Sequence, residues 1–225
     1  MRTLQDFVAY MKARGFQPGT VVDVGACYGT PELFRTFPDA YHIYFEPVRA
    51  REDRLRLLTT KYPGEYHLMA LADRPGMALL LVPEQRPETS MFIEPSRVET
   101  LSEDERRQLV EVPVSTLDDV LDHRDLRGPI LLKTDCQGYD REVLRGGRRL
   151  LRRVDLVVAE TLLYRFDSNT PTTIFSEIVG EMAQQGFEVF DIVSYNLRHS
   201  DDALLYVDLV FARRDASVWS PQGWT

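Results

Sequence analysis

The chain has 225 residues, of which 44% are hydrophobic, and a formal net charge of -8, values that suit one sizeable globular domain. The acidic balance argues against wholesale nucleic-acid binding, because neutralising phosphates requires a basic surface. No run approaches eighteen apolar residues and Cys27 and Cys136 are the only cysteines, which argues against a membrane span and a disulfide scaffold.

Helical and strand patterns alternate in the first part of the chain. An amphipathic helix is predicted over residues 3–14, and this N-terminus lacks the features of a signal peptide, so we expect a cytoplasmic protein. Strands are predicted at "TVVDVG", "AYHIYFEP" and "EYHLMALA", with helices at "TPELFRTF" and "PVRAREDRLRLLTT". The segment "MALLLVP" follows the turn "DRPG", which predicts a local hairpin with the third strand.

The second part of the chain continues the alternation after a polar stretch. Residues 84–110 are expected to form a mobile loop that includes a short helix at "SEDERRQL". Later strands are predicted at "VEVPVS", "PILLKTD", "VDLVVAET", "FEVFDIV" and "LLYVDLVFARR", and helices at "TLDDVLD", "YDREVLRGGRRLL" and "TTIFSEIVGEMAQQG". This order predicts an α/β fold with a mostly parallel sheet that is covered on both faces.

The ends of four predicted strands carry the candidate site residues. In sheets of this kind ligands bind beyond the carboxyl ends of the strands. These ends hold Asp23 with Gly25 and Gly29, Glu46, Asp135, and Glu160. Any one of these acids is equally well explained as a helix cap. All four together predict a site.

The spacing of the glycines indicates the kind of cofactor. Gly25 and Gly29 are spaced G-x-x-x-G, which lacks the G-x-G-x-x-G that cradles a pyrophosphate. Glu46 stands about 20 residues beyond the glycine turn, where an acid can hold ribose hydroxyls. A cofactor with ribose and adenine but no phosphate fits better, and S-adenosylmethionine is such a cofactor.

Two segments resemble a known family. "VVDVGACYGT", residues 21–30, is similar to the first motif of class I S-adenosylmethionine-dependent methyltransferases. "LLKTDCQGYDREVLRGG", residues 131–147, resembles the FkbM-type family, whose usual form is K-I-D-V-E-G-x-E-x-x-V-L-x-G. "VSTLDDVL", "ALADRPG" and "LVFARR" add to the resemblance, which spans roughly residues 20–213.

The resemblance implies a Rossmann-like, doubly wound sheet of seven strands with an antiparallel last strand and an inserted hairpin. It implies one methyltransferase domain over residues 1–225, with a cofactor half at 20–83, a loop insertion at 84–110, an acceptor half at 111–213 and a tail at 214–225. The methionine end of the cofactor would lie over Gly25, Ala26 and Gly29, the ribose on Glu46, and the adenine near Leu71 and Asp73.

The chain departs from the family pattern at three positions. The family often has Asn where Cys27 stands, and Glu where Gln137 and Asp140 stand. The first difference could loosen a contact with the cofactor. The second removes a charge near the reaction centre, and a metal site is not predicted.

Asp135 and Glu160 could serve a methyl transfer in one of two ways. An alcohol must lose its proton during attack, and Asp135 is the first candidate for the base and Glu160 the second. The alternative is that both hold a divalent cation through their oxygens. Candidate substrate contacts are expected in the later loops, and they are Tyr164, Arg165, Tyr195, Asn196 and His199. The alternative is that each of these is an ordinary surface residue.

The function expected from these observations is an S-adenosylmethionine-dependent O-methyltransferase that acts on a hydroxyl of a small molecule, such as a sugar or a secondary metabolite. A methyltransferase of RNA or protein and a non-catalytic binding module remain alternatives. The basic segment 145–153 could meet RNA phosphates, or its cations could answer the dipole at a helix end. A homodimer is a possible assembly.

Overall fold

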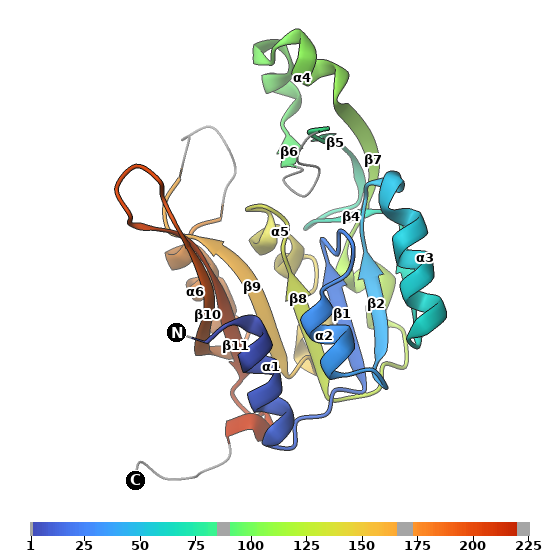
Figure 1. Cartoon of the computed structure of the whole chain (residues 1–225), viewed down its shortest axis with the longest axis vertical. Helices are drawn as coiled ribbons and strands as arrows, with labels where there is room; N and C mark the ends of the chain where they lie inside the picture. Colours follow the sequence, from blue (N-terminus) through green and yellow to red (C-terminus); the bar gives the residue numbers. More distant parts are fainter. Residues whose placement is uncertain (1, 85–90, 166–172, 220–225) are drawn as a thin grey trace.

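A seven-stranded sheet forms the centre of the molecule (Figure 1). The computed structural model describes residues 2–84, 91–165 and 173–219. The strand order is β3-β2-β1-β8-β9-β11-β10. The strands are β1 (Thr20–Val24), β2 (Tyr41–Phe45), β3 (Gly64–His67), β8 (Ile130–Thr134), β9 (Leu156–Leu162), β10 (Phe187–Leu197) and β11 (Leu204–Arg213).

The direction of the strands confirms the predicted fold class. Every pair from β3 to β9 is parallel, and β11 runs antiparallel to both β9 and β10. The parallel strands β1 and β8 are buried along their whole length, which explains why they read as continuous apolar runs. The chain therefore has the Rossmann-like, mostly parallel sheet with an antiparallel last strand.

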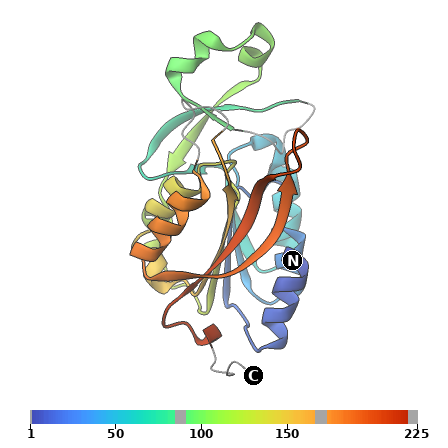
Figure 2. The same cartoon turned by 90° about the vertical axis from the view of Figure 1, so that its left-hand side faces the viewer.

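Helices cover both faces of this sheet (Figure 2). On one face lie α1 (Leu4–Ala13) and α2 (Pro31–Thr36), and α3 (Glu52–Lys61) packs beside β2 and β3. On the other face lie α5 (Asp140–Arg145), α6 (Phe175–Gln184) and the short turns η4 (Asp118–Asp122) and η5 (Leu150–Arg153).

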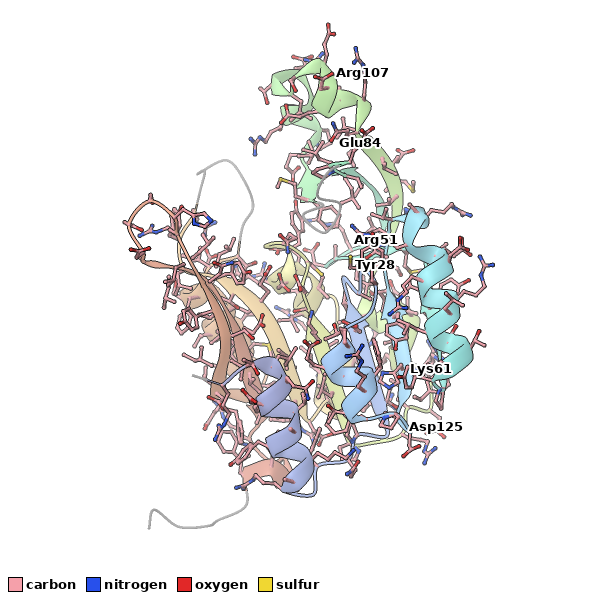
Figure 3. The ribbon with its side chains drawn as sticks, viewed as in Figure 1. Tyr28, Arg51, Lys61, Glu84, Arg107 and Asp125 are labelled. Carbon is pink, nitrogen blue, oxygen red and sulfur yellow. The ribbon has the colours of Figure 1, made fainter. Side chains whose placement is uncertain are left out.

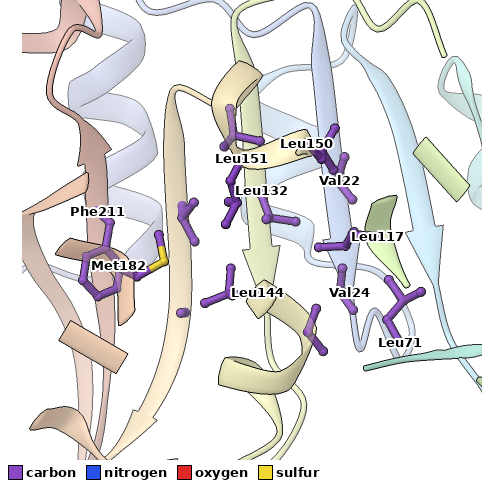
Figure 4. Packing of buried hydrophobic residues seen from close by; sticks show 14 of the residues in the cluster. Val22, Val24, Leu71, Leu117, Leu132, Leu144, Leu150, Leu151, Met182 and Phe211 are labelled. Atoms are coloured by element: carbon purple, nitrogen blue, oxygen red, sulfur yellow. The ribbon is translucent and has the colours of Figure 1, made fainter. Parts of the chain in front are cut away.

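The main core lies between the sheet and the second helical layer. Figure 4 shows Val22 and Leu132 from the sheet, Leu144 from α5 and Met182 from α6, all at most 1% exposed. Because successive side chains of a strand alternate in direction, Val22 and Val24 face this core while Asp23 faces the layer of α1 and α2. The apolar packing thus decides which face of the sheet receives the acids.

Helix ends follow the local sequence signals. Thr3 and Asp6 form a capping box at the start of α1. Helix α6 is followed by Gly186, whose φ of 86° is the left-handed conformation that glycine tolerates. Thr30 and Pro31 open α2 as predicted, but the Thr30 hydroxyl donates to Asp23 instead of capping the helix.

A second, four-stranded sheet follows β3 and projects beyond the carboxyl ends of the main sheet (Figure 1). Its order is β4-β7-β5-β6, with bounds Ala70–Leu71 for β4, Gly76–Leu81 for β5, Met91–Ile93 for β6 and Leu109–Ser115 for β7. Between β6 and β7 lie η3 (Pro95–Thr100) and α4 (Glu103–Arg107). We call residues 76–115 the insertion.

The structure corrects two expectations for this region. The third predicted strand does not form a hairpin with "MALLLVP", because β7 lies between β4 and β5, and the antiparallel neighbours of β5 are β6 and β7. Residues 91–110 are not a loop, and they include the predicted short helix as α4. Residues 85–90 of the expected loop lie outside the described part of the chain.

The basic segment 145–153 is engaged with carboxylates of the chain itself. Glu181 of α6, 5% exposed, pairs with Arg145 at 2.8 Å and Arg148 at 3.0 Å, and Arg149 pairs with Asp122 at 2.9 Å. Much of the positive charge of this segment is therefore neutralised by these ion pairs, and not by a helix dipole alone.

The end of the described chain packs back on the sheet. After β11 comes the turn η6 (Ser217–Trp219), in which Val218 is buried and the Trp219 Nε1 donates to the Arg213 carbonyl at 2.8 Å. Among the helices in the described residues, none combines the length and the apolar character that crossing a bilayer requires.

Candidate active site

A cavity of about 550 Å³ lies where the carboxyl ends of β1, β2, β8 and β9 meet the insertion. In Figure 3 the labelled Arg51 and Tyr28 mark its neighbourhood below the insertion. The walls comprise four groups: residues at and after the ends of β1 and β2 (Val24, Gly25, Cys27, Phe45, Glu46, Pro47, Arg51), apolar residues before and within the insertion (Met69, Ala70, Leu71, Leu80, Phe92), residues after β8 and in β9 (Asp135, Cys136, Gln137, Glu160), and residues of β10, β11 and their connection (Asn196, Leu197, His199, Leu205, Tyr206).

The turn after β1 brings a bare stretch of backbone to the cavity. Gly25 has a φ of 71°, and a Cβ there would lie 2.1 Å from the Asp135 carbonyl oxygen. The amides of Gly25 and Ala26 both donate to the Phe45 carbonyl at 3.0 Å. Only glycine satisfies both the left-handed backbone and this close approach. The glycine therefore allows the turn after β1 to pack directly against the backbone of the loop after β8.

Asp23 fastens this turn from below and does not line the cavity. Its carboxylate accepts bonds from the Thr30 amide at 3.0 Å and the Thr30 hydroxyl at 3.1 Å. Burial raises the pKa of Asp23, with the charge of Lys133 acting against it. Ala26 and Gly29, which were also predicted to touch the cofactor, are likewise absent from the described wall.

Glu46 lies at the wall, 1% exposed, and is already engaged by the protein. Its Oε2 accepts from the Cys27 amide at 2.8 Å, and its Oε1 accepts from the Val48 amide and the Arg51 guanidinium, both at 2.8 Å. The non-glycine φ of 51° at Cys27 aims that amide at the carboxylate. A carboxylate has about four lone-pair positions, so about one remains for a ligand.

The two residues predicted near the adenine are separated by the structure. Leu71 is buried and lines the cavity beside Met69, Leu80 and Phe92. The Asp73 side chain is 34% exposed, pairs with Arg74 at 3.4 Å, and is not part of the described wall.

The two predicted catalytic acids meet at the cavity. The Gln137 amide nitrogen donates to Asp135 Oδ1 at 3.1 Å and to Glu160 Oε2 at 3.3 Å, so one side chain spans both carboxyl groups. Gln137 has a φ of 51°, a conformation uncommon for a residue with a side chain. The second oxygen of the Asp135 carboxylate, Oδ2, accepts from the Lys133 ammonium at 3.1 Å.

The surroundings push the two acids toward opposite charge states. Burial acts to raise the pKa of Asp135, but the charge of Lys133 and the bonds from Lys133 and Gln137 outweigh it and lower that pKa. Burial, followed by the charges of Asp135, Asp140 and Asp208, raises the pKa of Glu160 well above its usual value. The surroundings thus favour the ionised form of Asp135 and disfavour the ionised form of Glu160.

The predicted substrate contacts divide into two groups. Asn196 and His199 line the cavity, and the Asn196 amide donates to the Tyr206 hydroxyl at 3.1 Å. Tyr195 is 53% exposed and Tyr164 lies under the Arg198 guanidinium, 4.4 Å from ring centroid to carbon. Arg165 pairs with Glu177. The described wall does not include these last three residues.

Several wall residues have no sequence signal for a site. Arg51 lies in a polar helix pattern, Phe92 in a stretch expected to be a loop, and Tyr206 in a strand. Lys133, which contacts Asp135, could have been found, because a lysine inside a strand predicted to be central and buried requires a buried partner. Within the described residues, no group of three or more His, Cys, Asp or Glu is arranged to hold a metal ion.

Comparison with known proteins gives one family and several distant structures. The model of the methyltransferase FkbM domain matches residues 23–189. No curated protein matches the chain. Similar solved structures include magnesium protoporphyrin IX methyltransferase from Synechocystis PCC 6803 with bound SAM, at 10% identity and a TM-score of 0.47, covering 93% of this chain and 77% of the other.

Two further structures are similar at the same level. A putative RNA methyltransferase from Pyrococcus horikoshii has 12% identity and a TM-score of 0.48, covering 93% of this chain and 83% of the other. The Burkholderia thailandensis 1,6-didemethyltoxoflavin-N1-methyltransferase has 10% identity and a TM-score of 0.48, covering 94% and 78%. Because the domain match spans well over half of the sequence, the chain belongs to the FkbM-type family of class I S-adenosylmethionine-dependent methyltransferases, and the protein is a methyltransferase.

Proposed function

We propose that the protein transfers a methyl group from S-adenosylmethionine to a hydroxyl group of a small molecule, such as a sugar or a secondary metabolite. The observation that carries this proposal is the pair of carboxyl groups of Asp135 and Glu160, which face the cavity and share the Gln137 amide. Removal of a hydroxyl proton requires a base within reach of the reacting oxygen, and this pair is placed to provide one.

The wall of the cavity fits the cofactor. A volume of about 550 Å³ lies within the range of small-molecule sites, roughly 300–1,000 Å³. Glu46 retains an acceptor position for a ribose hydroxyl, and Gly25 offers backbone without a side chain. Leu71, Leu80 and Phe92 offer an apolar surface suited to a flat base. When bound, S-adenosylmethionine supplies a methyl group that is already activated toward nucleophiles.

The residues of the chain would divide the remaining work. Asp135, ionised, accepts the proton that the hydroxyl of the acceptor loses. Glu160, whose surroundings disfavour its charged form, donates a hydrogen bond when it is protonated, and the Gln137 amide bridges the two carboxyl groups. Asn196 and Tyr206 also present polar groups to the cavity, where they can orient an acceptor with several oxygens.

A small-molecule acceptor is favoured over RNA by the charges. The cations of the basic segment 145–153 that pair with Glu181 and Asp122 are taken up within the fold, and the net charge of -8 opposes a polyanion. A protein acceptor and a non-catalytic binding module remain the competing functions.

Ligand binding tests the cofactor half of the proposal. Calorimetry with S-adenosylhomocysteine is expected to show saturable binding, and Glu46→Ala is expected to remove most of it. Asp53→Ala is the control, because the Asp53 side chain is 88% exposed on α3. A folded wild-type chain that does not bind the ligand would refute the proposal.

Turnover tests the catalytic half. With labelled S-adenosylmethionine and a panel of sugars and phenols, methyl transfer is expected, and Asp135→Asn is expected to lower kcat by about 10²-fold or more. A chelator separates base catalysis from a divalent cation held by Asp135 and Glu160, and activity is expected to survive it. Binding without transfer to any acceptor would favour the non-catalytic alternative.

A further inference from the structure

One face of the main sheet carries a row of acids around a single lysine. Asp23 of β1 and Lys133 of β8 are direct neighbours in the parallel register. Asp135 lies two residues beyond Lys133, and Asp208 of β11 is the register partner of Glu160 of β9. Since residues two apart on a strand share a face, these side chains come together on the side of the sheet that α1 and α2 cover.

Lys133 is deeply buried within this row. The residue is 6% exposed, and its ammonium group lies 3.1 Å from Asp135 Oδ2. In the described part of the chain, no other cation forms a salt bridge with any of the four acids of the row. A buried ammonium group without an ionised partner is strongly unfavourable, so the contact with Asp135 couples the charges of both groups.

The titratable groups that face Asp135 come from every neighbouring element. They are Lys133 of β8, the neighbouring thiol of Cys136, Asp23 from β1, Glu160 from β9, Asp208 from β11 and Asp140 from α5. Burial acts to lower the pKa of Lys133, but the charges of Asp135, Asp23 and Asp208 outweigh burial and raise it. Among the described residues, Lys133 is therefore the one cation next to five acids at this place in the fold.

The geometry also explains why the cation acts on Asp135 and not equally on Glu160. Asp135 accepts from Lys133 on Oδ2 and from Gln137 on Oδ1, so both its oxygens are fixed by donors. Glu160 accepts from Gln137 at the longer distance of 3.3 Å, and its register partner on β11 is another acid, Asp208. The asymmetry of these contacts distinguishes two acids that share one cavity.

We propose that Lys133 is a positioning residue of this site, whose buried ammonium group holds the Asp135 carboxylate in place as an anion at the wall of the cavity. Lys133 is not among the residues of the described cavity wall, so it acts through Asp135. The consequence for turnover rests on the proposed function, in which Asp135 is the base. The charge state of Asp135 can be measured without any acceptor.

The test is a carboxyl-carbon NMR titration of the full chain, with Asp135→Asn used to assign the Asp135 signal. In Lys133→Met the proton affinity of Asp135 is expected to rise at least tenfold, because its counter-charge is gone, and Lys133→Arg is expected to restore most of the effect. Lys61→Met is the matched control on the exposed end of α3, and it is expected to leave the titration unchanged. An unchanged Asp135 midpoint in a folded Lys133→Met variant would overturn the proposal.

A reciprocal measurement covers the case in which Lys133→Met fails to fold. Coupling between two groups is the same in both directions, so Asp135→Asn is expected to lower the proton affinity of the Lys133 ammonium at least tenfold, read from its nitrogen signal. An Asp135→Asn variant in which Lys133 titrates as in the wild type would contradict the proposal just as firmly.

Kinetics separates this proposal from the proposed function. If an acceptor is methylated, Lys133→Met is expected to move the acid limb of kcat/KM to higher pH, since Asp135 then takes up a proton more readily. A chain that shows both NMR shifts but methylates no acceptor would retain Lys133 as the positioning residue of Asp135 while refuting the proposed function.

Discussion

The backbone of Gly25 lies so close to Asp135 that a Cβ added to Gly25 would be 2.1 Å from the Asp135 carbonyl oxygen. This approach joins the turn after β1 to the loop after β8, and it explains the glycine without reference to any ligand. The same contact places the turn proposed to bind the cofactor against the residue proposed as the base, so a change at Gly25 is expected to affect both.

Gly25→Ala is expected to destabilise the fold and to abolish binding of S-adenosylhomocysteine. The left-handed φ costs a residue with a Cβ about 1–2 kcal/mol, and the clash adds to it, so the melting temperature should fall by at least about 4 °C. Gly180→Ala is the control, since a Cβ there meets no atom within 4 Å and alanine favours the helix by about 1 kcal/mol. Equal melting temperatures for Gly25→Ala and the wild type would argue against the contact.

Arg51→Met is expected to cost about 3 kcal/mol or more of unfolding free energy, because it leaves the buried Glu46 carboxylate without its cation. The matched control is Arg56→Met. The Arg56–Asp53 pair has the same distance of 2.8 Å, but its side chains are 61% and 88% exposed, against 6% and 1% for Arg51 and Glu46. The exposed pair should cost less than about 1 kcal/mol. Chemical denaturation measures both, and similar losses would show that burial is not decisive here.

Asp140→Asn is expected to stabilise the protein in a pH-dependent manner. Asp140 is fully buried, and burial raises its pKa from 3.8 to about 7. Below the unfolded value both states hold the proton, so the variant and the wild type should be equally stable. As the pH rises toward 7 the unfolded state releases that proton while the folded state keeps it, and wild-type stability falls.

The gain of the Asp140→Asn variant should therefore grow from near zero at pH 4 to at most about 4 kcal/mol at pH 8. Urea unfolding at both pH values measures it. A gain that is larger at pH 4 than at pH 8 would show that the sign is wrong.

Cys27→Asn is expected to raise stability by about 0.5–1 kcal/mol and to preserve binding of S-adenosylhomocysteine. Cys27 has a φ of 51°, a region in which asparagine is several-fold enriched among residues with side chains. Cys27→Val is the contrasting variant, because a β-branched residue in this region is strained and should lower stability by about 1–2 kcal/mol. Melting curves decide, and the idea fails if valine is tolerated better than asparagine.

The sequence by itself determined the alternation of strands and helices, the glycine turn after β1 and the acids at the strand ends. These are local properties, since apolar periodicity and turn chemistry are set by residues near one another in the chain. The family also follows from such local segments, above all residues 21–30 and 131–147.

Only the tertiary structure decided which of these residues share the cavity. Glu46, Asp135 and Glu160 line it, whereas the Asp23 carboxylate accepts from Thr30 and lies outside the described wall. The pairing of β7 between β4 and β5 could not be foreseen, because it joins segments far apart in the sequence. The charge states of the acids likewise depend on burial and on neighbours from other strands, and those neighbours exist only once the sheet has formed.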